Sequence, residues 1–319
     1  MAHPESPGSA KPEKSKFLSR IASSKLANVI RAGGAAAMIA GASSIAHAQP
    51  QNTNIEQTRT FPQFEGGNLK KTIEFIEKHR APGDWSRVWD KKTRILFVAE
   101  NHDVIEDRLA TADAMRSSGT THLAMEFLYQ DDQPKIDAYL ENKESRSTIR
   151  GLLKEVALWS GAEVAESYMN LIDAAKENRI AVIGIDIRKR TSTDSDKDVV
   201  PRNKAWAPVL ERVLSKNPDG RIVVLVGAMH TGYVDQSHYH YPTANQAVEE
   251  KGVPSIVVRL AGGQKDLAAL DTATTRRASV DLAARRLGIE NTSFLIRTTK
   301  KEDSDFVYHA PQSRTVDTR

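Results

Sequence analysis

The stretch RILFVAENHD, from Arg94 to Asp103, decides the fold of this chain. Its residues 95–98 form a continuous apolar run, which is typical of a strand buried on both faces of a parallel sheet. Glu100 and His102 follow this run directly. Because ligands of open parallel sheets bind beyond the carboxyl ends of the strands, the stretch predicts a parallel sheet with ionisable groups at that edge.

The rest of the chain alternates short apolar runs with segments that have the helical period. Further strands are predicted at 122–128, 180–186, 221–230 and 254–260, and two more, at 293–299 and 305–310, are expected to pair at a sheet edge. Helices are predicted at 68–80, 104–118, 134–142, 147–159, 163–178, 243–252 and 278–288, and the segment 195–216 is expected to contain a loop and a helix. This alternation predicts an α/β fold with a mostly parallel open sheet and helices on both faces.

Three segments are expected along the chain: a signal peptide or disordered leader at 1–48, a linker at 49–68, and a single α/β domain at 69–319. The leader is basic, then Ala-rich and weakly apolar, and it ends on the small-x-small pattern Ala-His-Ala at Ala48. Cleavage before Gln49 would make the protein secreted or periplasmic. A flexible tail, or an uncleaved leader read by another secretion machinery, is the alternative.

Composition excludes several functions. The chain has no cysteine, so disulfides and cysteine nucleophiles are absent. Six of its 45 basic residues and two of its 41 acidic residues lie in 1–48, so the remainder carries 39 of each and gives no reason to expect nucleic-acid binding. A transmembrane span is not expected either, because it would need about 20 strongly apolar residues.

Ionisable residues recur at the ends of four predicted strands. The first strand ends on Glu100, with His102 two residues further on, and the second runs into Glu126. The third ends on Asp186 and the fourth on His230. A buried charge costs several kcal/mol when it is unpaired, so this recurrence predicts one polar site. Taken singly, each residue has an alternative role as a helix cap or a salt-bridge partner.

Two kinds of chemistry fit these residues. In the favoured version Glu100, His102, Glu126 and His230 hold a divalent metal (Mn, Zn or Co) that lowers the pKa of a bound water. In the other version His102 or His230 is the general base and Glu100 fixes its tautomer. In either version Asp186 orients a histidine or binds substrate.

Other segments suggest weaker candidates. Arg202 is a candidate for binding an anionic substrate, since arginine binds carboxylate or phosphate through two hydrogen bonds. Tyr233 opens a segment, 233–241, that is rich in tyrosine and histidine and could line a pocket or ligate haem iron. The sequence has no Gly-x-Ser-x-Gly or His-Glu-x-x-His motif, which argues against ordinary serine hydrolases and zincin proteases.

The motifs resemble the superfamily that contains erythromycin esterase, ChaN-type haem-uptake lipoproteins, Tiki metalloproteases and a domain of bacterial toxins and effectors. Its pattern is a first strand ending in Gly-Glu-x-His, a second ending in Glu, and a late strand ending in Gly-x-x-His. The matching segments here are AENHD (Glu100, His102), LAMEFL (Glu126) and LVGAMH (Gly227, His230).

One further segment and one departure bear on this resemblance. VPRNKAW is similar to an Arg-Asn element of the toxin-type members, which implies substrate-binding roles for Arg202 and Asn203. Ala99 stands where the family usually has glycine, so a ligand could approach the backbone less closely there. The resemblance spans about 95–233 and implies the fold and the position of the site.

The leading hypothesis is an exported hydrolase-like protein that cleaves an ester or peptide. Such a protein could be a secreted effector that acts on a host. The alternative is a haem or iron-complex binding protein without catalysis. A third reading is a catalytically silent toxin domain that acts by contacting a host protein.

Overall fold

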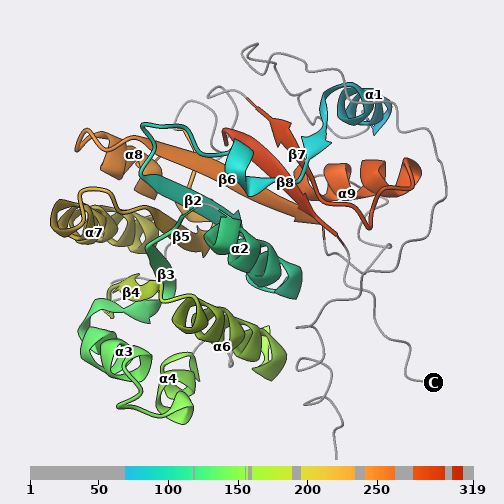
Figure 1. Cartoon of the computed structure of the whole chain (residues 1–319). Coiled ribbons are helices and arrows are strands. Elements are labelled where there is room, and N and C mark those ends of the chain that lie inside the picture. Colours follow the sequence, from blue (N-terminus) through green and yellow to red (C-terminus); the bar gives the residue numbers. More distant parts are fainter. Residues whose placement is uncertain are drawn as a thin grey trace, which may run out of the picture. The chain divides into compact units, whose positions relative to one another are not determined.

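The computed structural model describes residues 69–117, 119–154, 156, 160–188, 195–233, 241–262, 276–298 and 304–311 (Figure 1). The expected leader and linker lie outside the described residues, as do most of the tyrosine and histidine residues of 233–241. All of the described residues belong to one compact unit, Asn54–Arg319.

The core is an eight-stranded sheet of order β1-β7-β8-β6-β2-β5-β3-β4. Its strands are β1 (Ala81–Pro82), β2 (Ile95–Glu100), β3 (His122–Tyr129), β4 (Ala181–Asp186), β5 (Ile222–Gly227), β6 (Ser255–Gly262), β7 (Phe294–Arg297) and β8 (Phe306–Ala310). The ladders from β8 through β6, β2, β5 and β3 to β4 are parallel, whereas β1 and β7 are antiparallel additions. The predicted fold class is confirmed, and the last two predicted strands pair with each other.

The helices also follow the predicted order. They are α1 (Leu69–His79), α2 (Ile105–Ser117), α3 (Gln133–Leu140), α4 (Arg146–Leu152), α6 (Ala162–Glu177), α7 (Ser195–Lys216), α8 (Ala244–Glu249) and α9 (Arg276–Arg286). Some predicted boundaries are wrong: α4 ends at Leu152, well before the expected 159, and the strand expected at 221–230 stops at Gly227, where Ala228–His230 form a 3-10 turn. In the part of the chain that the structure describes, no helix combines the length and apolar character needed to cross a membrane.

The period of two along each strand divides the core between the two faces of the sheet. Leu96 and Val98 belong to the apolar cluster that contains residues of α2 and α6, which pack beside each other (Figure 1). Ile95 and Phe97 belong to a second cluster with residues of α7 and α8. Both faces of the parallel strands are therefore covered, which explains why their sequences are apolar without alternation.

Candidate active site

Three neighbouring strands, β2, β5 and β3, bring the candidate site together at their carboxyl ends. Glu100 ends β2 and is paired in register with Gly227, the last residue of β5. The ladder between β5 and β3 ends at Leu225 and Met125, so Glu126 is the first residue of β3 beyond it. Glu100 and Glu126 therefore lie on either side of the end of β5.

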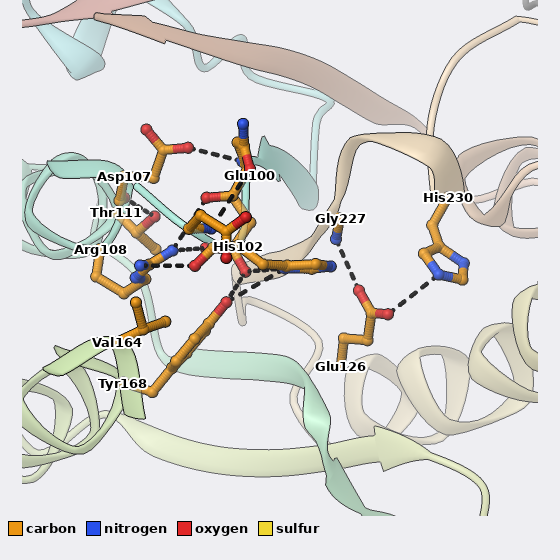
Figure 2. A network of polar contacts seen from close by, with 12 residues as sticks. Glu100, His102, Asp107, Arg108, Thr111, Glu126, Val164, Tyr168, Gly227 and His230 are labelled. Atoms are coloured by element: carbon orange, nitrogen blue, oxygen red, sulfur yellow. Dashed lines mark hydrogen bonds and ion pairs between the residues drawn. The ribbon is translucent and has the colours of Figure 1, made fainter. Parts of the chain in front are cut away.

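The two glutamates point to opposite faces of the sheet. Glu100 continues the alternation of Leu96 and Val98, whose side chains face α2 and α6. Glu126 continues the alternation of Ala124, which packs in the cluster of α7. The site is therefore two polar groups, one on each face, that meet around the end of β5 (Figure 2).

Glu100 is the centre of the first group and is 2% exposed. Arg108 of α2 donates from Nη1 to Glu100 Oε2 at 2.8 Å, and the hydroxyl of Tyr168 from α6 donates to Oε1. Burial raises the pKa of Glu100, but the charge of Arg108 and the hydrogen bonds from His102 and Tyr168 lower it more. Glu100 is therefore a carboxylate in the folded protein, with a pKa below its ordinary value.

His102 takes its orientation from Glu100. Its Nδ1 lies 3.0 Å from Glu100 Oε1, and because a carboxylate only accepts, Nδ1 carries the hydrogen and donates it. Among the described residues, Nε2 of His102 has no hydrogen-bond partner, and the side chain is 28% exposed. Burial lowers the pKa of His102, but Glu100 and then Glu126 raise it more, so the net pKa lies above its ordinary 6.5.

Arg108 also holds the turn that follows β2. Its Nη2 donates to the carbonyl oxygen of His102 at 3.0 Å, and its Nε donates to Ser167 Oγ at 3.0 Å. Arg108 is 2% exposed, so these bonds form in a dry environment. One buried arginine thus neutralises Glu100 and fixes the backbone that carries His102.

Glu126 is the centre of the second group. Its Oε2 accepts from the backbone N–H of Gly227 at 2.7 Å, and its Oε1 accepts from Arg202 Nη2 at 2.7 Å. His230 Nε2 lies 3.1 Å from the same Oε1. Burial raises the pKa of Glu126, but His230 and Arg202 lower it more, and the net pKa lies well below its ordinary value.

Arg202 of α7 joins Glu126 to Asp186. It donates from Nε to Asp186 Oδ1 at 2.8 Å and from Nη2 to Oδ2 at 2.9 Å. Burial raises the pKa of Asp186 even though Arg202 opposes this. Because Arg202 binds two carboxylates of its own chain, it is occupied in the structure and does not present a free guanidinium to an anionic substrate.

His230 completes the second group and is 1% exposed. Asn203 donates from Nδ2 to the carbonyl oxygen of Pro242 at 2.9 Å, so its Oδ1 is the acceptor facing His230 Nδ1 at 2.7 Å. The indole of Trp206 lies 4.7 Å from the imidazole, centroid to centroid. Neighbours on α7 therefore fix the ring of His230 on two sides.

The side chain of Tyr233, a predicted site residue, bonds to a residue outside the two polar groups. Its hydroxyl donates to Oδ2 of Asp305, the residue just before β8, at 2.7 Å. Burial and the charge of Asp305 raise the pKa of Tyr233, which opposes the phenolate that would bind haem iron. Tyr241 likewise donates to the carbonyl oxygen of Met229 at 3.2 Å. Neither described tyrosine of this segment thus fits the role of a haem ligand.

Two residues of the site, Arg108 and Tyr168, do not follow from the sequence motifs. Arg108 lies on the helix directly after the Glu100 turn, so a search for a counter-charge near each buried carboxylate could have found it. Tyr168 comes from α6, far along the chain, and carries no signal apart from its place in an amphipathic helix.

The donor set does not fit the predicted divalent metal. Both oxygens of Glu100 accept hydrogen bonds from Arg108, Tyr168 or His102, and both oxygens of Glu126 accept from Arg202 or Gly227. A metal would have to displace two buried guanidinium groups that balance these carboxylates. Among the residues described here, no group of three or more acidic or histidine side chains has an arrangement suited to a metal ion.

Fold and site together define an α/β protein with a Glu/His site at the carboxyl edge of a mostly parallel sheet. Residues 89–198 match the family model described as haem-binding uptake, Tiki superfamily, ChaN. The superfamily resemblance inferred from the motifs is therefore confirmed over this segment, which contains Glu100, His102, Glu126 and Asp186. A search of curated protein sequences found no match.

Several solved structures have a similar chain path. The type III effector HopBA1 is 15% identical, with a TM-score of 0.43, and the match covers 69% of this chain and 88% of that one. Erythromycin esterase EreC in its open conformation is 12% identical, with a TM-score of 0.44 and coverage of 70% and 91%. The ChaN protein of Campylobacter jejuni, solved with cofacially bound haem, is 13% identical, with a TM-score of 0.34 and coverage of 68% and 87%.

Proposed function

We propose that this protein is a hydrolase of esters or peptides in which His102 is the general base and Glu100 its orienting partner. One observation carries the proposal: a buried carboxylate holds the Nδ1–H of a partly exposed histidine whose Nε2 has no hydrogen-bond partner among the described residues. A general base needs this arrangement, with the proton fixed on one nitrogen and a lone pair on the other.

The reaction follows from this tautomer. His102 Nε2 removes a proton from a water molecule whose oxygen attacks the substrate carbonyl carbon. When the bond to the leaving group breaks, the same Nε2 returns the proton to that group. The imidazolium formed between these steps is stabilised by Glu100, and Glu126 adds a second negative charge nearby, because both raise the pKa of His102.

The second polar group supports Glu126 in this scheme. Arg202 and the Gly227 amide each bind one of its oxygens, so its negative charge is held at a fixed place beside β5. His230 and Asn203 complete its surroundings from α7 and the turn after β5. We assign Glu126 and His230 to the catalytic group, and Asp186, Arg202 and Asn203 to its support.

Purified full-length protein and a panel of ester and peptide substrates test the proposal. His102→Gln should reduce kcat about 100-fold or more, the typical contribution of a general base. His122→Gln is the matched control, because His122 also lies at a strand end but at the opposite, amino edge of the sheet, bonded to Thr121 Oγ1 at 2.7 Å. Equal activity of wild type and His102→Gln would refute the proposal.

Haem binding is the second candidate, and the description of the matching family model favours it. The described tyrosines Tyr233 and Tyr241 are bonded within the fold, so neither presents a free hydroxyl to haem iron. Haem titration of the full-length protein tests this candidate: a saturable Soret band at stoichiometric haem supports it, and a spectrum of free haem contradicts it.

Export of the protein is also part of the proposal, and the leader pattern at 1–48 supports it. An effector role with a host protein as partner would follow only in an exported protein. Fusing residues 1–60 to a reporter that is active only outside the cytoplasm tests export, and a reporter that stays silent would contradict it.

A further inference from the structure

The hydroxyl of Tyr168 lies where the two partners of the general-base pair meet. It donates a hydrogen bond to Glu100 Oε1, the same oxygen that accepts from His102 Nδ1. The hydroxyl oxygen also lies 3.3 Å from His102 Nδ1. Tyr168 therefore touches both members of the pair, although it comes from a separate helix, α6 (Figure 2).

The ring of Tyr168 is held so that its hydroxyl can point only into this site. The side chain is 1% exposed. Phe127 packs edge-on against it at 5.2 Å, and the guanidinium of Arg108 lies 4.5 Å from its ring centroid. Because aromatic and cation–π contacts fix the plane of the ring, the direction of the hydroxyl is set before any substrate arrives.

We propose that Tyr168 is a positioning residue for His102: its hydroxyl locks the Glu100 carboxylate so that His102 presents Nε2 to the substrate. This inference rests on the proposed hydrolase function. Glu100 is held at three points, by Arg108 on Oε2 and by Tyr168 and His102 on Oε1. Without the hydroxyl, the carboxylate can rotate about its last bond and carry the imidazole with it.

The Tyr168 hydroxyl also stabilises the negative charge of Glu100 by donating a hydrogen bond to it. Burial and the charge of Glu100 raise the pKa of Tyr168 well above 10, so its hydroxyl is protonated and donates at neutral pH. Glu100 Oε1 accepts from both Tyr168 and His102, so two donors compete for the negative charge of one oxygen. The charged groups that face His102 are Glu100 from β2, Arg108 from α2 and Glu126 from β3. Removing the hydroxyl leaves these three in place and strengthens the pull of Glu100 on His102.

Tyr168→Phe tests the proposal, because it removes one oxygen and keeps the ring that packs against Phe127 and Arg108. Tyr139→Phe is the matched control. Tyr139 is also a buried tyrosine whose hydroxyl donates to a carboxylate, that of Asp173 on the same helix α6, and it belongs to α3. Both variants lose one buried hydroxyl and remove one of several donors from a carboxylate, since Arg108 and His102 still bind Glu100 and Arg146 still binds Asp173.

For Tyr168→Phe we expect kcat to fall roughly 10- to 100-fold, with KM changed little, as for a misplaced catalytic group. The acidic limb of the pH–rate profile and the midpoint of the His102 Hε1 signal in an NMR titration should both move to higher pH. Tyr139→Phe should change neither. If Tyr168→Phe matches Tyr139→Phe in kcat and in midpoint, the inference is wrong.

This design separates the inference from the proposed function. If wild type shows no His102-dependent hydrolysis, the proposed function fails. The NMR titration still tests the contact, because the midpoint of His102 shifts in Tyr168→Phe whether or not the protein is an enzyme. Activity in wild type, together with an unchanged kcat and midpoint in Tyr168→Phe, overturns only the role of Tyr168.

Discussion

The imidazole of His102 packs directly over the bare Cα of Gly227. A Cβ atom built at position 227 would lie 2.6 Å from His102 Nε2 and 2.8 Å from Cε1. The amide of Gly227 meanwhile binds Glu126 Oε2. One residue at the end of β5 therefore joins the two polar groups, because it leaves room for the histidine of one and holds the carboxylate of the other.

Gly227→Ala should move His102 out of place. The backbone at Gly227 has φ −59° and ψ 144°, which alanine adopts freely, so the effect is steric. We expect kcat to fall about 100-fold, since small displacements of a catalytic group cost this much. The free energy of unfolding should fall by about 1–3 kcal/mol, as for other overpacked sites. Gly151→Ala is the control, because a Cβ there meets no atom within 4 Å. Equal kcat in the two variants would contradict the packing described here.

The pH dependence of activity should follow the ionisation of His102. Its pKa lies above 6.5 because Glu100 and Glu126 outweigh burial, and a general base must be neutral to act. The rate should therefore rise with pH through a midpoint above 6.5. In Glu100→Gln the midpoint should fall, because the nearest negative charge is gone. NMR titration of His102 Hε1 measures both values, and a wild-type midpoint at or below 6.5 would disprove this electrostatic account.

The raised pKa of His102 also determines whether its contribution to the free energy of unfolding grows or falls with pH. A histidine whose folded pKa is raised adds stability that is fully present below its unfolded pKa and is lost as the pH rises through the folded value. Glu126, with its lowered pKa, contributes in the opposite direction: its stabilisation is present above the ordinary value of 4.5 and is lost in acid as the pH falls through the folded value.

Much of the fold could be predicted because local patterns decided it. The run from Ile95 to Val98 is apolar without alternation, which is typical of a strand that is covered on both faces in a parallel sheet. The convergence of Glu100, Glu126 and His230 could also be expected, since parallel strands end at one edge. The end of the strand before His230 was misjudged, because Ala228 and Met229 are apolar and sequence alone does not show where a ladder stops.

The arrangement within the site depends on contacts that no local pattern encodes. The period of two sends Glu100 and Glu126 to opposite faces, but only the strand order, with β5 between β2 and β3, brings them together again. The occupancy of their oxygens by Arg108, Tyr168 and Arg202 is likewise tertiary. Because of these contacts, each oxygen of Glu100 and Glu126 already accepts at least one hydrogen bond, and both carboxylates are balanced by arginine.

Arg202 should be among the most important residues for stability. Replacing it with Met leaves the buried carboxylates of Glu126 and Asp186 without their shared cation, which should lower the free energy of unfolding by about 3–5 kcal/mol. Arg116→Met is the control, since its pair with Asp113 is half exposed on both sides and should contribute at most about 1 kcal/mol. Urea denaturation measures both variants. A loss for Arg202→Met no larger than that for Arg116→Met would show that the buried pairs do not stabilise the fold.

Chelation should leave the protein active. The oxygens of Glu100 and Glu126 accept hydrogen bonds from arginine, tyrosine, histidine and a backbone amide, so a divalent ion would have to break these bonds before it could bind. We therefore expect unchanged kcat after treatment with EDTA, and elemental analysis without stoichiometric Mn, Zn or Co. Glu126→Ala provides the comparison: if wild type contains a stoichiometric metal that this variant loses, then Glu126 is a metal ligand, and Arg202 and His230 must move away from it when the ion binds.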